Sequence, residues 1–187
     1  EDALLSAVAV RGAWVPLVHA ALGHDATCQP SVICSRPGAP AGRWHADGGH
    51  TRYTFIGASA DAPYALCVFV PLVGLPPPTL TDAPAGAAEA VGAQRWRHGL
   101  GCTVFWPGSH RFSECPHLGA AASTRLRSVV SGTLEAGDAL CYDYRLVHCG
   151  SPNDAEDGER PILQLTYLRA GYADRARNYG YDELWCT

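Results

Sequence analysis

The sequence contains neither methionine nor lysine, so all 14 of its basic residues are arginines. Alanine, glycine and proline are abundant, and a GC-rich coding sequence explains the missing lysine better than a function does. Without methionine, residue 1 is not a natural start, and we expect a processed product, a trimmed chain or a domain of a larger protein. The formal net charge of -4 and the lack of a basic stripe give no reason to expect nucleic acid as a partner.

Long apolar runs are also missing. No stretch of about 18 apolar residues escapes interruption by charge or proline, which argues against a transmembrane helix. The chain opens with Glu1 and Asp2, not with the basic segment of a signal peptide. With 187 residues, 47% of them hydrophobic and 17% charged, we expect one folded soluble domain, cytoplasmic or organellar rather than secreted.

The cysteines form no C-x-x-C pair, so the sequence gives no sign of a zinc knuckle or a thioredoxin motif. Cys67, Cys102 and Cys141 lie within apolar runs, where a free cysteine behaves as a small hydrophobic residue. A chain of this size folds without disulfides, although eight cysteines permit them. We expect mostly reduced thiols.

Short apolar runs separated by turn residues predict a mainly β protein. Helical spacing over residues 2–23, interrupted by Gly12 and Pro16, predicts a helix that is kinked or in two pieces and covers one sheet face. Strands are predicted at 28–34, 51–56, 64–73, 101–106, 125–131, 139–144 and 161–168. The pattern favours a barrel or a double-sheet jelly roll. We expect a helical cover over 1–24, a jelly-roll core over 28–169 and a tail over 170–187.

The segment 74–99 contains three consecutive prolines and no periodic pattern. A loop of this length is either functional or an insertion. A lid over a pocket and a mere insertion are equally compatible with the sequence.

His45 and Asp47 form the most informative motif, within the stretch RWHADGG at 43–49. Side chains two residues apart on an extended strand lie on the same face. A third ligand has to come from elsewhere, and His148 is the best candidate. Two histidines and one carboxylate on one side of a metal, with open positions opposite, are typical of a non-haem Fe(II) oxygenase site.

The last predicted strand carries polar residues on one of its two faces. Alternation places Arg160, Ile162, Gln164 and Thr166 on one face, and Leu163, Leu165 and Tyr167 on the other. The first set suits the lining of a polar pocket better than a packed core. Arginine is the residue that binds a carboxylate with two parallel hydrogen bonds.

Other histidines and aromatic residues are weaker candidates. His110 follows a turn and is interpreted as structural, while His50 stays a possible neighbour of the ligands or of the substrate. The larger aromatic side chains are expected in the core or the pocket wall: Trp44, Tyr53, Trp96 and Trp106.

Taken in order, these stretches resemble the phytanoyl-CoA dioxygenase family of Fe(II)/2-oxoglutarate-dependent oxygenases, over roughly residues 28–180. The matching stretches are WHADG at 44–48, VFVPL at 68–72, GCTVFWPGSH at 101–110, GDA at 137–139, YRLVH at 144–148, Asn153 and the pair Arg160-Pro161. Any one of these stretches alone is unspecific, whereas their occurrence together in the family's order is specific for the family. The sequence departs from the family's usual residues at Gly42, Leu100 and Gly150.

The resemblance implies a double-stranded β-helix, a cupin-like jelly roll, with iron held by His45, Asp47 and His148. It implies that Arg160 binds the far carboxylate of 2-oxoglutarate and that Phe69 packs beside this cosubstrate. The family often has a serine two residues after the second histidine. Here that position is Gly150, and Ser151 follows it as the candidate cosubstrate contact. No catalytic residue is expected beyond the metal ligands.

The resemblance further implies that Fe(II), 2-oxoglutarate and O₂ serve to hydroxylate a small organic substrate, with release of succinate and CO₂. Related halogenases have a small residue at the position of Asp47, so the carboxylate favours hydroxylation. Two alternatives stay open from the sequence. One is a cupin-like metalloenzyme that does not use 2-oxoglutarate, and the other is a catalytically inactive jelly-roll binding module of a larger protein.

Overall fold

The computed structural model describes residues 3–50, 62–76, 79–81, 95–97, 100–112, 130–154, 156 and 158–172. Its helices are α1 (Ala3–Arg11), α2 (Val15–Leu22) and the short 3-10 helix η2 (Ser109–Arg111). Its strands are β1 (Thr27–Ser35), β2 (Ala65–Pro71), β3 (Thr79–Thr81), β4 (Arg95–Arg97), β5 (Thr103–Phe105), β6 (Val130–Ser131), β7 (Leu140–Asp143), β8 (His148–Gly150) and β9 (Arg160–Leu168). All strand pairs are antiparallel.

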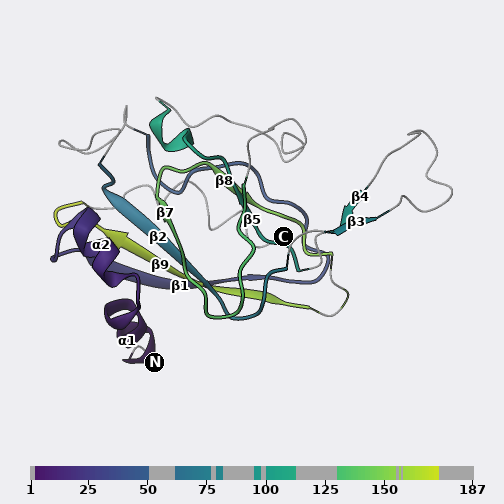
Figure 1. Cartoon of the computed structure of the whole chain (residues 1–187), viewed down its shortest axis with the longest axis horizontal. Helices are drawn as coiled ribbons and strands as arrows, with labels where there is room; N and C mark the ends of the chain where they lie inside the picture. The colour runs from purple at the N-terminus through teal and green to yellow at the C-terminus, as the bar shows by residue number, and fades with distance from the viewer. Residues whose placement is uncertain are drawn as a thin grey trace.

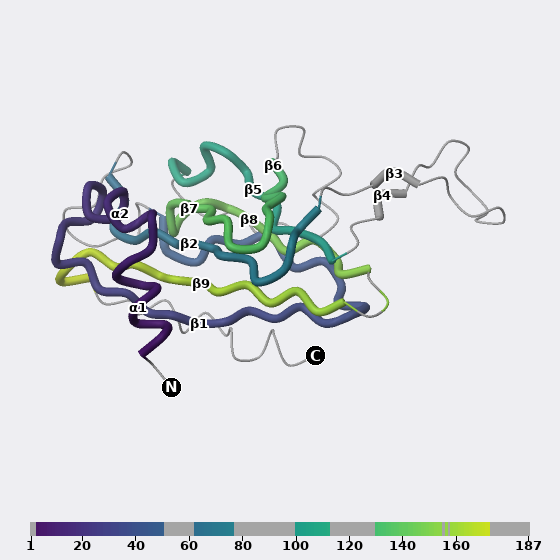
Figure 2. The backbone as a smooth tube through the Cα atoms, turned by 60° about the horizontal axis from the view of Figure 1, so that its bottom comes forward, coloured from purple at the N-terminus to yellow at the C-terminus, as the bar shows by residue number. Residues whose placement is uncertain are grey.

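Two of the sheets face each other around a shared core. One has the strand order β1-β9-β2-β7, and the other has the order β6-β5-β8. Figure 2 shows β1, β9 and β2 running side by side, with β5, β6 and β8 lying over them. Phe69, Tyr142 and Ile162 of the first sheet pack with Phe105 of the second in one buried cluster. The mainly β, jelly-roll architecture predicted from the sequence is confirmed.

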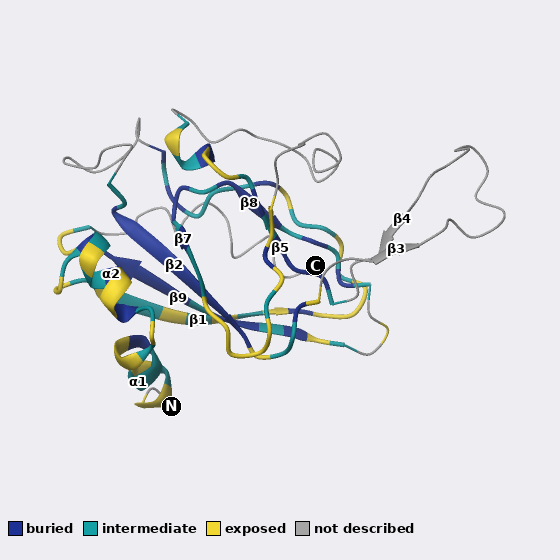
Figure 3. Ribbon diagram, viewed as in Figure 1, coloured by how far each residue is buried: buried dark blue, intermediate teal, exposed yellow. Residues whose placement is uncertain are grey.

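The helices cover the opposite face of the four-stranded sheet (Figure 1). The expected break between them is present, because a Cβ atom on Gly12 would lie 2.3 Å from the ring of Trp14 and Pro16 occupies the first turn of α2. Tyr167 of β9 fastens both helices, since its hydroxyl donates to the Ala9 carbonyl and accepts from Trp14 Nε1, each at 2.7 Å. Figure 3 shows several buried residues in α2, whereas Ala9 is the buried residue of α1.

Among the described residues, no single helix is long and apolar enough to cross a membrane. Only α1 and α2 taken together pass such a test, and they are bent by 70° at the break between them.

Strands β2 and β9 are buried on both faces, and their side chains alternate as the sequence predicts. Cys67, Phe69 and Ile162 point into the space between the sheets, whereas Leu163 and Leu165 pack under the helices. The register pairs Phe69 with Gln164 and Cys67 with Thr166. The face that carries Arg160, Gln164 and Thr166 is therefore the inner one.

Several predicted elements differ in extent from the observed ones. His148 begins a strand of its own, β8, and a turn closed by the Leu146 amide and the Asp143 carbonyl separates it from β7. Segment 74–99 contains two short paired strands, β3 and β4, which the sequence analysis did not predict. The predicted strand at 51–56 lies outside the described residues, and of the one at 125–131 only Val130 and Ser131 are described.

The cysteines of the described residues are free thiols: Cys28, Cys34, Cys67, Cys102, Cys141 and Cys149. This agrees with the expectation of reduced thiols for these positions. Cys115 and Cys186 lie outside the described residues.

Candidate metal centre

His45 and His148 meet through a short antiparallel bridge between their backbones. The His45 amide donates to the His148 carbonyl at 2.9 Å, and the His148 amide donates to the His45 carbonyl at 2.8 Å. This pairing places the two imidazole rings side by side, with their centroids 4.4 Å apart. Residues more than a hundred positions apart in sequence thus lie opposite each other, as the sequence analysis requires.

Both imidazoles are oriented in the same way by the backbone. Nδ1 of His45 lies 2.8 Å from the Arg43 carbonyl oxygen, and Nδ1 of His148 lies 2.8 Å from the Leu146 carbonyl oxygen. A carbonyl oxygen only accepts hydrogen bonds, so each Nδ1 carries a proton and each Nε2 is the ring nitrogen that faces Asp47. Such a bond fixes the tautomer and the ring orientation of a metal-ligating histidine.

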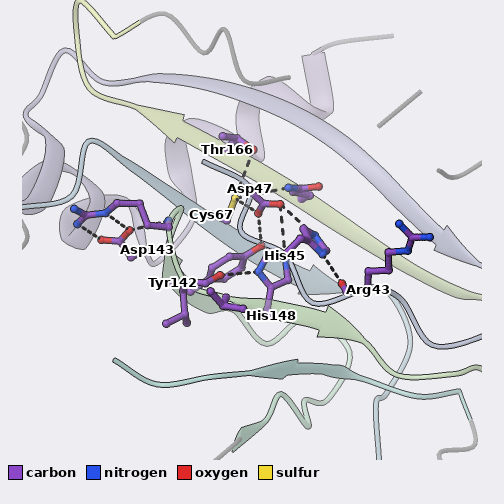
Figure 4. Close-up of polar contacts among 12 residues, drawn as sticks. Arg43, His45, Asp47, Cys67, Tyr142, Asp143, His148 and Thr166 are labelled. Atoms are coloured by element: carbon purple, nitrogen blue, oxygen red, sulfur yellow. Dashed lines mark hydrogen bonds and ion pairs between the residues drawn. The ribbon is translucent and has the colours of Figure 1, made fainter. Parts of the chain in front are cut away.

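Asp47 supplies the third donor atom. Its Oδ1 lies 3.7 Å from Nε2 of His45 and 3.7 Å from Nε2 of His148 (Figure 4). Among the metal-binding residue types of the described part of the chain, His45, Asp47 and His148 form a group whose ligand atoms lie close enough together to hold a metal ion. Their side chains are 28%, 11% and 5% exposed for His45, Asp47 and His148, so the centre opens to solvent on the His45 side.

The local backbone differs from the extended strand that the sequence analysis assumed. His45 lies in the bridge, but Asp47 lies in a bend. The Gly48 amide donates to the Tyr144 carbonyl at 2.9 Å, and a Cβ atom on Gly48 would lie 2.3 Å from the ring of Tyr144. Glycine at position 48 is therefore needed for this bend, which directs the carboxylate toward both imidazoles.

The other carboxylate oxygen of Asp47 is also occupied. Tyr142 donates its hydroxyl hydrogen to Oδ2 at 3.0 Å, and the Cys67 thiol lies 3.6 Å from the same atom. Burial, followed by the charge of Asp47, raises the pKa of the Tyr142 phenol and of the Cys67 thiol. The sequence analysis missed both contacts, although the alternation along β2 and β7 places both side chains on the inner face.

His148 is neutral at ordinary pH. Burial lowers its pKa, and this outweighs the nearby Asp47 carboxylate, which acts in the opposite direction. A neutral imidazole is the form that binds a metal.

Arg160 begins β9 and is buried, with 6% of its surface exposed. Its Nη1 donates to the carbonyl oxygens of Leu100 and Ser151, each at 3.2 Å. Its Nε is buried without a hydrogen-bond partner, and no carboxylate of the described residues forms an ion pair with it. Burial lowers its pKa. A buried guanidinium without a counter-charge is costly unless an anion joins it.

Glycines shape the surroundings of Arg160. A Cβ atom on Gly101 would lie 2.6 Å from its Nη1, and one on Gly150 would lie 3.3 Å from its Nη2. The Gly42 amide donates to the Gly150 carbonyl at 2.9 Å, and Leu100 contributes a carbonyl oxygen. The three positions at which the sequence departs from the family's usual residues thus lie together beside this guanidinium.

The remaining candidates lie at the edge of the centre. Phe69 is buried on the inner face, with its ring centroid 5.0 Å from that of Tyr142. Ser151 is buried, and its carbonyl oxygen accepts from Arg160. Phe69 also lines a small apolar cavity between the sheets, together with Pro71, Leu75, Thr103, Phe105, Gly132, Leu134, Leu140 and Ile162.

His50 and His110 do not belong to the metal group. His50 is buried, and its Nε2 donates to the Ser109 carbonyl at 3.1 Å. The Ser109 hydroxyl in turn accepts from the Val147 amide at 2.8 Å, next to His148. His50 therefore holds η2, which contains His110, against the segment that positions a ligand. Trp44 is buried in a small cluster with Val147 and Cys149, as expected.

Comparison with known proteins supports the family indicated by the sequence motifs. Residues 97–162, which include His148 and Arg160, match the family model of phytanoyl-CoA dioxygenase (PhyH). No curated protein sequence matches the chain.

Solved structures match over most of the chain at low identity. They include AviO1 from Streptomyces viridochromogenes Tue57 (21% identity, TM-score 0.53, 87% of this chain and 60% of that one). They also include SnoN, a non-haem alpha-ketoglutarate-dependent epimerase from nogalamycin biosynthesis (19% identity, TM-score 0.55, 89% of this chain and 56% of that one). A third is HygX from Streptomyces hygroscopicus with nickel and 2-oxoglutarate bound (10% identity, TM-score 0.60, 91% of this chain and 67% of that one).

The chain spans 60% of the length of AviO1 and 56% of that of SnoN, so it corresponds to little more than half of such proteins. At these identities the likeness concerns the fold. The predicted resemblance is confirmed: the chain matches the phytanoyl-CoA dioxygenase family over residues 97–162 and shares the fold of non-haem, 2-oxoglutarate-dependent enzymes over most of its length.

Proposed function

We propose that this protein is an Fe(II)- and 2-oxoglutarate-dependent dioxygenase that hydroxylates a small organic substrate. The balanced reaction consumes the substrate C–H bond, 2-oxoglutarate and O₂, and yields the alcohol, succinate and CO₂. The observation that carries the proposal is the convergence of two imidazole Nε2 atoms on one oxygen of Asp47, on a fold whose inner face also holds a buried arginine.

The donor set fits Fe(II). Two imidazoles and one carboxylate are a ligand combination suited to non-haem iron with open positions. His45, Asp47 and His148 would hold the metal, because both Nδ1 atoms are bonded to backbone carbonyls and both Nε2 atoms face Oδ1 of Asp47. The partial exposure of His45 leaves one side of the centre open for a substrate.

The surroundings of Arg160 fit a dicarboxylic acid. The guanidinium is buried, its Nε has no partner among the described residues, and glycines keep its edge uncovered. Arginine binds a carboxylate with two parallel hydrogen bonds, which the far carboxylate of 2-oxoglutarate would accept. Phe69 and Ser151 are proposed as further contacts of this cosubstrate.

The residues of the chain position the reactants and exclude water. When bound, the iron with its 2-oxo acid and O₂ supplies the oxidising power for C–H oxidation. Asp47 fills a position that a halide would need, which supports hydroxylation over halogenation. SnoN is an epimerase of similar fold, so product analysis is the decisive test of the finer claim. Hydroxylation places one atom of ¹⁸O₂ in the product and one in succinate.

The test of the coarser claim is anaerobic titration of the purified protein with Fe(II) and then 2-oxoglutarate. We expect a weak visible charge-transfer band in the wild type, and no band in His45→Ala or His148→Ala. The His110→Ala variant is the matched control, because His110 lies outside the metal group. Iron binding without a band would favour a cupin-like metalloenzyme that does not use 2-oxoglutarate. Lack of iron binding would favour a binding module.

A further inference from the structure

The two oxygens of Asp47 have different surroundings. Oδ1 lies 3.7 Å from Nε2 of both histidines. Oδ2 accepts the hydroxyl of Tyr142 at 3.0 Å and lies 3.6 Å from the Cys67 sulfur. One oxygen therefore faces the metal position, while the other is held by side chains of the sheet (Figure 4).

Tyr142 reaches Asp47 because of the strand register. In the antiparallel pair of β2 and β7, Cys67 is the direct partner of Tyr142, so both side chains rise from the same face of the sheet. The carboxylate of Asp47 rests above this pair. Of the two donors, the hydroxyl is the stronger, because a thiol is a weak hydrogen-bond donor and its contact is longer.

The phenol ring of Tyr142 is fixed by other rings. Its centroid lies 5.0 Å from that of Phe69, 5.0 Å from that of Phe105 and 5.2 Å from that of His148. The side chain is 4% exposed, so water does not compete for its hydroxyl. The ring therefore has little freedom to turn away from Asp47.

We propose that Tyr142 is a positioning residue that makes Asp47 a one-oxygen ligand, with Oδ1 toward the metal and Oδ2 retained by the phenol hydroxyl. This inference rests on the metal centre of the proposed function. A carboxylate released from this bond is able to turn and present both oxygens to the metal. It would then occupy a position that the 2-oxo acid or O₂ needs, so Tyr142 keeps that position open.

The experiment is titration of the full chain with Co(II), a spectroscopic substitute for Fe(II) whose visible spectrum reports the number of ligands. Tyr142→Phe removes only the hydroxyl. We expect Co(II) affinity to fall about 10–100-fold, the usual effect of removing a partner of a metal ligand. We also expect the spectrum at saturation to differ from that of the wild type.

The control is Tyr167→Phe, which removes a buried hydroxyl from the helix-covered face of the sheet, remote from the metal group. It should lower the melting temperature of the metal-free protein and leave the Co(II) affinity and spectrum unchanged. Cys67→Ala tests the same carboxylate oxygen independently. It should weaken Co(II) binding less than Tyr142→Phe does, because it removes the weaker donor.

A double-mutant cycle with Asp47→Ala, titrated to millimolar Co(II) so that weak binding by two histidines is still measured, separates positioning from packing. Where the carboxylate is already gone, Tyr142→Phe should cause no further loss of Co(II) affinity. An equal loss in both backgrounds, or an unchanged affinity and spectrum in Tyr142→Phe alone, would overturn the assignment of Tyr142. If the wild type bound no Co(II), the metal centre itself would be wrong, and this inference would fail with it.

Discussion

The two faces of the central strands β2 and β9 are both largely buried, but they are built from different residues. The face under the helices consists of Leu66, Val68, Val70, Leu163, Leu165 and Tyr167. The inner face of the same strands carries Cys67, Phe69, Arg160, Ile162, Gln164 and Thr166. Neighbouring residues on one strand therefore have different roles: those on the outer face pack against the helices, and those on the inner face include the residues proposed to bind ligands.

The difference follows from the cost of burying polar groups. An apolar side chain contributes free energy of folding by leaving water, whereas a polar group needs a partner wherever it is buried. Cys67, Gln164 and Thr166 provide partners for one another. Arg160 keeps a buried Nε without one. A folded chain retains such a group at a cost, which is best explained by a ligand that completes it.

The largest expected effect is on metal binding, and it tests the inner face. Removing one ligand in His45→Ala should abolish Fe(II) binding at micromolar concentrations. The melting temperature of the metal-free protein should change little, because this side chain is 28% exposed. Calorimetric titration with Fe(II) under anaerobic conditions, with thermal melts in chelator, measures both. A large drop in stability without metal would mean that the inner face is structural as well.

The second effect concerns Arg160 and the 2-oxo acid. Because removing one partner of a buried ion pair leaves the other unpaired, Arg160→Ala should weaken 2-oxoglutarate binding at least about a hundredfold. Arg160→Lys should restore little, since an ammonium does not reproduce the two parallel hydrogen bonds. The measurement is titration of the iron-loaded protein with 2-oxoglutarate.

A matched ligand sharpens this test. 2-Oxobutyrate chelates a metal but has no second carboxylate. The wild type and Arg160→Ala should therefore bind it equally. Weaker binding of 2-oxobutyrate by the variant would show that Arg160 supports the metal centre and not the far carboxylate.

The third prediction concerns the outer face, with Leu165 fully buried under the helices. Leu165→Ala should lower the free energy of unfolding by about 2–5 kcal/mol through lost burial and a cavity. Thr166→Val, one residue along and on the inner face, should lower it by about 1 kcal/mol. Urea unfolding measures both. If Leu165→Ala also changed Fe(II) affinity in the folded protein, the separation of the two faces would be wrong.

The sequence predicts the fold well where periodicity is strong. Alternation along residues 160–168 correctly assigns the inner and outer faces of β9, and Gly12 with Pro16 predicts the break between α1 and α2. The strands β3, β4 and β8 were not predicted, because each has only three residues and, unlike β5, does not lie within a longer apolar run. Strands this short are formed by pairing with a distant partner and leave little periodic signal of their own.

The candidate metal ligands could be named from residue type and spacing, whereas their supporting contacts could not. His45, Asp47 and His148 are recognised by the chemistry that such residues share. Tyr142 is an ordinary buried tyrosine in the sequence, and its bond to Asp47 depends on the pairing of β7 with β2 and on a bend at Gly48. Such contacts arise from tertiary structure, which local patterns do not encode.

The smallest expected effect compares two buried histidines, His50 and His148. Burial lowers the pKa of both. Only His148 directs a free Nε2 lone pair at Asp47, because Nε2 of His50 donates to the Ser109 carbonyl. In the unfolded chain His50 and His148 take up protons at about pH 6.5. In the folded protein their lowered pKa values keep them from doing so until the pH is lower.

These shifts set the sign of the pH dependence. Each histidine contributes stability that is complete above the unfolded pKa and is lost as the pH falls toward the lowered folded pKa. His50→Gln keeps a donor for Ser109 but removes the titration. The metal-free variant should therefore lose less stability than the wild type in urea melts between about pH 7.5 and 5.5. Its Fe(II) affinity at neutral pH should equal that of the wild type. An unchanged pH dependence would place the titrating group elsewhere, and weaker Fe(II) binding would make His50 part of the metal centre.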